Sequence, residues 1–242
     1  GSSRALSQDT VNYLWNNTNG AFTAEIASNL PNTPDQLNSA EVNLASATED
    51  AGLIKSFADS MVAVSQFSGS TGNEGIPGKQ GTRLFSYSGF EFNQAVAKGL
   101  MGAMVLTNVS EHLDASVNAD NNTIIGGKGT AMQHEWDLAF GYVAIPTDYD
   151  TAKSYANTEA NRALAVGGYF GERGKFIKAG GTVYEAFRKG RAAIGAKDYA
   201  TRDAAIATIK EFIEKTFAAA CYYYITHPQA ATERPAQLHE LS

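Results

Sequence analysis

Apolar side chains recur every three or four residues along most of the chain after residue 45. The clearest pattern covers residues 200–225 and is closed by Pro228, and a similar stripe covers residues 46–67. The two-residue alternation typical of half-buried strands is almost absent, and so are the residue pairs typical of hairpin turns. The sequence therefore predicts an all-α protein built as a helical bundle.

A central helix is predicted from Gly89 to about Val109, with His112 as its furthest end. Apolar residues surround most of its second half, which is typical of a helix enclosed by other helices. Gly99 and Gly102 lie inside it, where each glycine costs about 1 kcal/mol relative to alanine. We therefore expect another backbone to pass close to these two positions. Further helices are predicted over residues 129–143, 149–165, 174–194 and 236–242, with Gly167-Gly168 ending the second of them and Gly180-Gly181 interrupting the third.

The segments between the helices are rich in residues that favour loops. Residues 1–45 contain many Asn, Ser and Thr residues and allow one short helix around Val11–Trp15. Residues 68–82 and 114–128 are predicted as further loops. We therefore expect a loop-rich N-terminal segment, 1–45, followed by one helical-bundle domain, 46–242.

Charge and cysteine content exclude some classes of protein. The net charge of −6 argues against a general nucleic-acid-binding protein, which normally carries a basic stripe. No apolar run approaches the roughly 20 residues that a membrane-spanning helix needs. The single Cys221 cannot form a disulfide within the chain, and its alanine neighbours predict a buried position.

The run Gly129–Tyr142 concentrates the side chains that could carry chemistry. On a helix, His134 and Asp137 lie three residues apart and share a face, whereas Glu135 is turned about 100° away. The pair could bind a metal, transfer protons, or hold the structure together as a buried imidazole–carboxylate pair. A metal site would need further ligands from other helices, for which the chain offers Glu91, Glu111, His112 and Glu185.

Several motifs of known chemistry are missing. His134-Glu135 is not followed by the second histidine of a zinc-peptidase helix, and Asn121 stands where a P-loop needs its first glycine. No nucleophile is marked, so we assign no catalytic and no cofactor-binding residue. The basic cluster Arg188-Lys189-Gly190-Arg191 is interpreted as a solvated face, with binding of an anionic ligand as the alternative.

The chain resembles a bacterial lipoprotein family catalogued as domain of unknown function 4856. The resemblance spans roughly residues 50–240 and rests on GFEF (89–92), KGLMGA (98–103), the 129–142 run, AFRKGRAAI (186–194), and EK (214–215) with AAA (218–220). It implies an exported lipoprotein that faces the periplasm or the cell surface. Contact with a membrane would then occur only through a lipid anchor outside this sequence.

A shorter resemblance concerns the candidate site. The run His134-Glu135-Trp136-Asp137 is similar to the His-x-x-Glu helix of imelysin-like proteins, with Asp137 in place of Glu. That resemblance implies a helical bundle of imelysin-like arrangement and a role in iron acquisition.

These observations lead to three hypotheses. We expect an envelope binding protein rather than an enzyme, with a small ligand or a metal ion, such as iron or another divalent metal, as its partner. Its metal ligands would be His134 and Asp137, with Glu91, Glu111 and His112 as further candidates. The alternatives are a hydrolase of peptides or glycans that uses Glu135 or Asp137 as a general base, and a surface scaffold without a small-molecule site.

Overall fold

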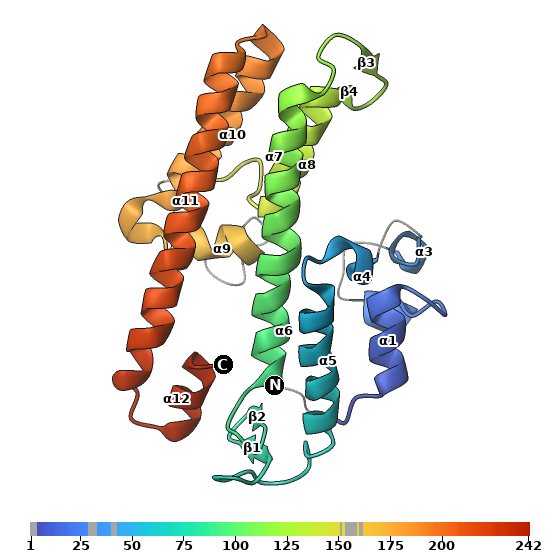
Figure 1. The fold of residues 1–242 in the computed structure, drawn as a ribbon, viewed down its shortest axis with the longest axis vertical. Helices are drawn as coiled ribbons and strands as arrows, with labels where there is room; N and C mark the ends of the chain where they lie inside the picture. Colours follow the sequence, from blue (N-terminus) through green and yellow to red (C-terminus); the bar gives the residue numbers. More distant parts are fainter. Residues whose placement is uncertain (1–3, 29–32, 40–42, 151, 153–158, 160–161) are drawn as a thin grey trace. The chain divides into compact units, whose positions relative to one another are not determined.

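The chain divides into two compact units. Figure 1 labels the helices and strands of both. The structure is a computed structural model that describes residues 4–28, 33–39, 43–150, 152, 159 and 162–242. Unit 1 combines Gly1–Met104 with Ile225–Ser242, and unit 2 is Val105–Tyr224. The predicted loop-rich segment 1–45 therefore lies in unit 1, and the predicted bundle supplies residues to both units. Both units are mainly α-helical, as predicted.

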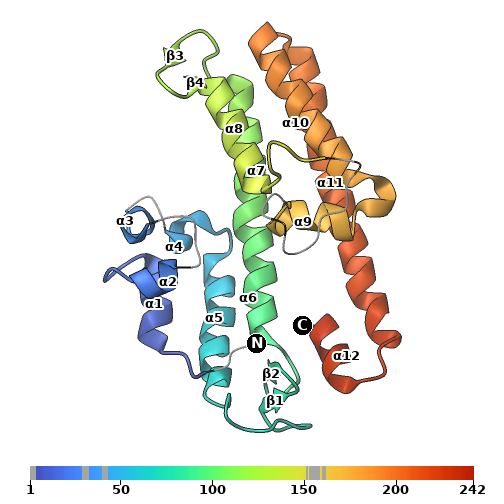
Figure 2. The same ribbon diagram turned by 180° about the vertical axis from the view of Figure 1, so that it is seen from behind.

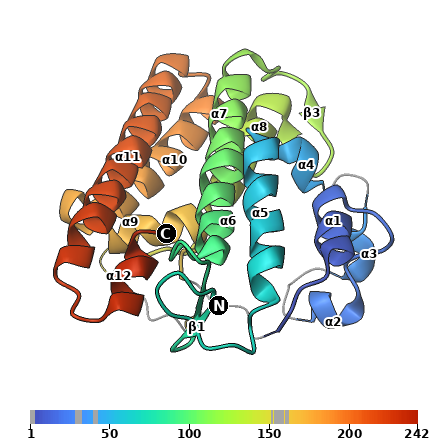
Figure 3. The ribbon, with the colours of Figure 1, turned by 60° about the horizontal axis from the view of Figure 1, so that its bottom comes forward.

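Unit 1 packs helix α5 between α1 and α6, as Figure 3 shows. Its elements are α1 (Gln8–Asn16), α2 (Ala24–Ala27), α3 (Pro34–Leu37), α4 (Leu44–Ala47), α5 (Ala51–Ser65), β1 (Gly78–Gln80), β2 (Arg83–Phe85), α6 (Phe92–Leu100) and α12 (Arg234–Glu240), with a 3₁₀ turn at His227–Gln229. Ile54, Ala58 and Val62 form the buried stripe of α5, at the four-residue spacing of one helical face.

At Gly99 a close neighbour from α5 is present, but it is a side chain and not the backbone that we expected. A Cβ atom on Gly99 would lie 2.7 Å from Cδ1 of Ile54, so a larger residue would displace that side chain. A Cβ atom on Gly102 would meet nothing within 4 Å, and the prediction for that glycine is wrong. The central helix also differs from a regular α-helix, because Met101–Leu106 is a half-buried π-helical segment rather than an enclosed one.

Unit 1 also contains short elements that the sequence did not predict. Residues 68–85 include an antiparallel hairpin in which Gly78 pairs with Phe85 and Gln80 with Arg83. Strands of three residues are too short to show alternation, which explains the missed prediction. In the loop-rich segment, Thr33 begins α3 with a capping box that is completed by Gln36.

In unit 2, α7 and α8 form an antiparallel pair. Helices α10 and α11 also run antiparallel and lie side by side in the views from both sides (Figures 1 and 2). The elements of this unit are α7 (Thr107–Asn118), β3 (Ile124–Ile125), β4 (Gly129–Thr130), α8 (Ala131–Val143), α9 (Ala165–Glu172), a 3₁₀ turn (Lys175–Ile177), α10 (Ala179–Ala196) and α11 (Tyr199–Thr226). The predicted helices over 129–143 and 200–225 are confirmed, and the helix at the C-terminal end of the chain is α12.

The core of unit 2 is centred on Trp136 of α8, which is only 1% exposed. Its indole nitrogen donates a 3.0 Å hydrogen bond to the carbonyl oxygen of Phe187 on α10. Gly190, one turn further along α10, lies against the Trp136 ring, and a Cβ atom there would overlap two ring carbons. The glycine of the basic cluster is therefore required by packing.

Several predicted boundaries in unit 2 are wrong. Helix α7 continues to Asn118, well into the predicted loop 114–128, and β3–β4 form a second hairpin. Gly167-Gly168 lies inside α9 instead of ending a helix, and Gly180-Gly181 lies in the first turn of α10. Most of the predicted helix 149–165 lies outside the described residues.

Two further expectations concern the burial of Cys221 and the presence of a membrane-spanning helix. Cys221, which we expected to be buried, is exposed on α11. Among the described residues, no helix combines the length and the apolar character needed to cross a membrane.

Candidate ligand site

The predicted motif forms helix α8, and its start is fixed locally. The hydroxyl of Thr130 accepts a hydrogen bond from the backbone N–H of Gln133, and the Gln133 side chain accepts one from the backbone N–H of Thr130. This capping box satisfies two of the N–H groups that a helix start leaves unpaired. The following residues therefore enter the helix in a defined orientation.

The helical rotation explains how the polar residues of α8 are separated. Met132, Trp136 and Ala139 form the buried face. At about 100° per residue, Glu135 and Asp137 lie on opposite sides of Trp136, and His134 lies about 160° away from it. The two carboxylates therefore face different neighbouring helices, and His134 points away from the core of the unit.

Asp137 pairs with an arginine of α10. Its two carboxylate oxygens accept hydrogen bonds from Nε and Nη2 of Arg191, at 2.8 and 3.3 Å. This is the forked geometry in which an arginine binds a carboxylate most specifically. The Asp137 side chain is 52% exposed, so the pair lies at the surface.

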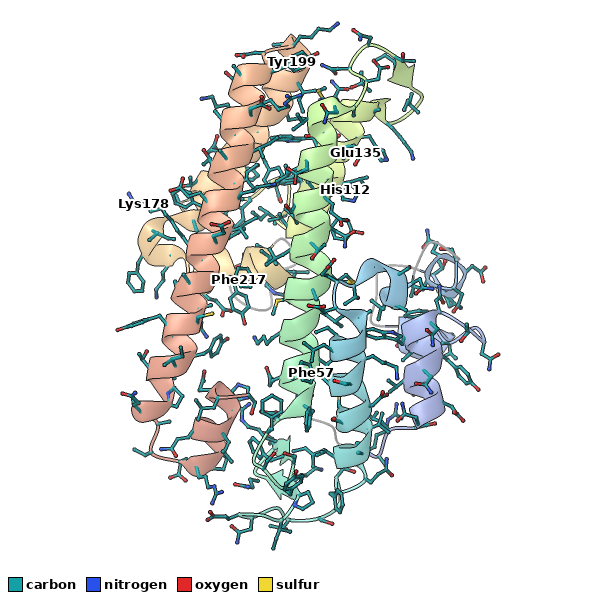
Figure 4. All side chains as sticks on the ribbon, in the orientation of Figure 1. Phe57, His112, Glu135, Lys178, Tyr199 and Phe217 are labelled. Carbon is teal, nitrogen blue, oxygen red and sulfur yellow. The ribbon has the colours of Figure 1, made fainter. Side chains whose placement is uncertain are left out.

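Glu135 pairs with a histidine of α7. Nδ1 of His112 and Oε2 of Glu135 are 2.7 Å apart, and the two labelled side chains meet between α7 and α8 in Figure 4. The imidazole also stacks on Tyr142, with the ring centres 5.5 Å apart. An imidazole–carboxylate pair is thus present, although its members are not the predicted His134 and Asp137.

The remaining predicted site residues lie apart from these pairs. His134 is half-buried, and no hydrogen bond to its ring is found within the described part of the chain. Glu111 is exposed on α7. Glu91 belongs to unit 1, where its buried carboxylate is 2.7 Å from Nδ1 of His239.

The described residues contain no group of three or more His, Cys, Asp or Glu side chains that could hold a metal ion. Within the described part of the chain, no hydrogen bond or ion pair joins any two of the five candidates. The metal-site assignment therefore stays a prediction without geometric support.

A pocket of about 550 Å³ opens beside the Asp137–Arg191 pair in unit 2. Four aromatic residues from α8 and α10 line it, Trp136, Phe140, Tyr184 and Phe187, of which Trp136 and Phe187 are at most 2% exposed. These rings support one another edge to face, with 5.7 Å between the centres of Trp136 and Phe187 and 5.3 Å between those of Phe140 and Phe187. The walls are therefore held by packing within the unit.

Polar residues also line this pocket. Asp137, Arg188 and Arg191 line it, and Thr147 contributes the carbonyl oxygen that accepts a 2.5 Å hydrogen bond from the Tyr184 hydroxyl. Arg188 also forms an ion pair with Glu185, at 3.1 Å. Pockets that bind small molecules are typically 300–1,000 Å³ in volume, mostly apolar, and contain a few fixed polar groups, so this pocket is suited to a ligand.

The sequence identified some of these residues for other reasons. Asp137 was predicted as a metal ligand, and Arg188 and Arg191 were part of a cluster interpreted as a solvated face. The aromatic walls were missed, because Tyr184 and Phe187 are read from the sequence only as apolar positions of a helix. One sequence signal for the polar part of the pocket was available. Arg188 and Arg191 are three residues apart, which places both side chains on one helical face.

Comparison with known proteins identifies the family. The family described as "Domain of unknown function (DUF4856)" matches residues 3–242. No curated protein and no solved structure matches the chain. The similarity to imelysin-like proteins is not shown by these comparisons and stays a prediction. Because the family match covers nearly the whole chain, the protein belongs to the DUF4856 family.

Proposed function

We propose that this protein is a non-enzymatic binding protein whose ligand occupies the aromatic-walled pocket of unit 2. The observation that supports this proposal is the combination of a 550 Å³ pocket, four aromatic wall residues and an ion pair at its edge. Transfer of an apolar ligand from water into the pocket would stabilise the complex, and the polar edge would orient the ligand.

The charges at the edge suggest the chemistry of the ligand. Arg191 is held in place by Asp137, and Arg188 lies one helical turn before it on the same side of α10. A ligand carboxylate, sulfonate or phosphate could replace or share the Asp137 contact, because the arginine fork can donate to two oxygen atoms of one such group. We therefore propose a ligand with an apolar, flat body and one anionic group.

The fluorescent probe anilinonaphthalene sulfonate has this chemistry and tests the pocket directly. We expect it to bind the native protein at one site, with fluorescence enhancement. Arg191→Gln should weaken binding by about tenfold, because one charge-assisted hydrogen bond is lost. Ala192→Trp, at an exposed position of the pocket wall, should abolish binding by filling the pocket.

Two control variants make this experiment specific. Lys189→Gln removes a neighbouring cation that does not line the pocket, and Phe176→Ser removes an exposed aromatic ring elsewhere in unit 2. Neither should change the dissociation constant. If Ala192→Trp, with an unchanged circular dichroism spectrum, binds the probe as well as the wild type does, the pocket is not the ligand site.

We also propose that the protein is exported to the cell envelope, as the family resemblance implies. Cell fractionation and protease accessibility of the protein expressed from its complete natural gene test this proposal. Recovery of the protein only in the cytoplasmic fraction would contradict it.

The metal hypothesis has its own test. If His134 binds a metal, elemental analysis and calorimetric titration should detect stoichiometric metal in the wild type and a loss of affinity in His134→Ala. Equal, stoichiometric binding by both proteins would remove His134 from the site.

The hydrolase alternative is favoured by one observation, the 2.7 Å contact between His112 and Glu135. A histidine oriented by a carboxylate can act as a general base. Hydrolysis of peptide or glycan substrates by the wild type and its loss in His112→Gln would support this alternative. Absence of turnover and of bound ligand in both tests would leave the scaffold hypothesis.

A further inference from the structure

The turn between α9 and α10 presents an apolar side chain to solvent between two lysines. Its sequence is Gly174-Lys175-Phe176-Ile177-Lys178. Phe176 is 87% exposed, and Ile177 beside it is 38% exposed. A single exposed apolar residue is common on protein surfaces, but two adjacent ones flanked by cations form a composite surface that needs an explanation.

Backbone hydrogen bonds and packing at its base define the conformation of this turn. The backbone N–H of Ile177 donates to the carbonyl oxygen of Gly174 at 3.2 Å, and that of Lys178 donates to Lys175 at 3.1 Å. Ala179, which follows the turn, is fully buried in the core of unit 2. A Cβ atom on Gly174 would lie 2.7 Å from Cβ of Ala179, so the turn is packed tightly at its base.

The charges of the turn differ in sign from those of the whole chain. Lys175 and Lys178 flank the apolar pair, and Figure 4 shows Lys178 at the outer side of the segment between α9 and α10. The ammonium group of Lys175 lies 5.0 Å from the centre of the Phe176 ring, so the cation and the ring are presented together. The chain has a net charge of −6, and a uniform surface of that sign would be repelled by an anionic partner.

We propose that this turn binds the surface of an anionic lipid bilayer. Phe176 enters the interfacial region between headgroups and acyl chains, where aromatic side chains are favoured. Lys175 and Lys178 remain at the level of the lipid phosphates and bind them electrostatically. An exposed ring between two cations is complementary to an anionic bilayer, because the ring can enter the apolar region below the headgroups while the cations contact the negatively charged surface.

This role is separate from the pocket and from a lipid anchor. One ring and two lysines give weak, reversible binding, because each lysine near an anionic surface contributes about a fivefold increase in affinity. Such contacts orient a protein on a membrane to which it is already held. The proposal therefore predicts a preferred orientation of unit 2 on the bilayer.

Vesicle flotation with the full chain tests the proposal. Because the binding is weak, we expect a fraction of the protein to float with vesicles that contain phosphatidylglycerol, at high lipid concentration and low salt. None should float with vesicles of phosphatidylcholine alone, and high salt should abolish flotation. Phe176→Ser should lower the partition coefficient by about tenfold, because the buried apolar area is lost. Lys175→Gln combined with Lys178→Gln should lower it by about thirtyfold.

Matched variants elsewhere in unit 2 provide the controls. Ile124→Ser removes an apolar side chain that is 71% exposed on the β3–β4 hairpin, and Lys189→Gln removes an exposed cation of α10. Both should bind vesicles as the wild type does. The variant Phe176→Trp reports insertion of this residue into the bilayer directly, because the fluorescence emission of the new tryptophan should move to shorter wavelength when phosphatidylglycerol vesicles are added.

Two results would overturn the proposal. The first is equal flotation of the wild type and the Phe176→Ser and double-lysine variants. The second is absence of flotation together with an unchanged emission of Phe176→Trp at low salt. Neither result depends on the pocket, because Phe176 does not line it.

Discussion

At the scale of single residues, two glycines of α10 illustrate opposite roles. Gly190 faces the core and lies against the Trp136 ring, whereas a Cβ atom on Gly195 would meet nothing within 4 Å. Both lie inside the same helix, so their intrinsic helix propensities are the same. Any difference between substitutions at these two positions therefore reports packing.

We predict that Gly190→Ala lowers the free energy of unfolding by about 3 kcal/mol, because the added carbon overlaps the indole ring. Gly195→Ala should raise it by about 0.5 kcal/mol, because alanine reduces the conformational freedom of the unfolded chain. Urea denaturation of both variants measures the difference. Equal effects would contradict the packing seen between α8 and α10.

The titration of Asp120 provides a second residue-scale prediction. Hydrogen bonds from Thr123, through its side chain and its backbone N–H, lower the pKa of Asp120 from 3.8 to about 2. The stabilising contribution is therefore fully present above pH 3.8 and is lost as the pH falls towards 2. In Thr123→Val, the pKa of Asp120 should rise towards 3.8, as measured by carbon NMR titration of the carboxyl group.

The control for this titration is a second motif of the same kind. Thr201 donates to Asp198 and lowers its pKa in the same way. Thr201→Val should change the pKa of Asp198 and leave that of Asp120 unchanged. A shift of both groups in either variant would indicate a wider change in the fold.

At the scale of elements, the buried side-chain amide of Asn121 joins the end of α10 to the start of α8 in unit 2. Asn121 is 7% exposed and lies in the segment between α7 and the β3–β4 hairpin. Its Nδ2 donates to the carbonyl oxygen of Ile194 at 2.8 Å, and its Oδ1 accepts from the Thr130 hydroxyl at 2.9 Å. Both polar groups of the side chain are satisfied, so it connects α10 to the start of α8.

We predict that Asn121→Ala lowers the free energy of unfolding by about 2 kcal/mol, because the Thr130 hydroxyl and the Ile194 carbonyl oxygen each lose a buried hydrogen bond. The neighbouring Asn122 is exposed, and Asn122→Ala should change the free energy by less than about 0.5 kcal/mol. Chemical denaturation compares the pair. If both variants lower the free energy of unfolding by similar amounts, burial of the Asn121 amide does not determine how much it stabilises the fold.

At the scale of the whole molecule, the C-terminal segment returns to unit 1 and packs beside residues far away in sequence. The Glu91 carboxylate is 1% exposed and contacts Arg83 at 3.5 Å and His239 at 2.7 Å. The Ser242 hydroxyl also accepts a 2.9 Å hydrogen bond from the backbone N–H of Glu91. Glu91, predicted as a metal ligand, therefore connects the start of α6 with α12 in the described structure.

We predict that Glu91→Ala lowers the free energy of unfolding by about 3 kcal/mol, because it leaves Arg83 and His239 without their buried partner. Glu74→Ala is the control, since Glu74 pairs with Arg234 of α12 but is 83% exposed. That variant should cost less than about 0.5 kcal/mol. Increased proteolysis of α12 in Glu91→Ala alone would support the same interpretation.

The sequence alone determined the helical class, the position of α8 and α11, and the family. These features depend on local signals, namely the helical period, the helix-closing Pro228 and the order of short motifs. It did not determine the two hairpins, because strands of two or three residues carry no readable period. The tertiary structure decided which partner each polar residue takes. Spacing along α8 placed His134 and Asp137 on one face, but partners are set by the helices on either side, which bring Arg191 to Asp137 and His112 to Glu135.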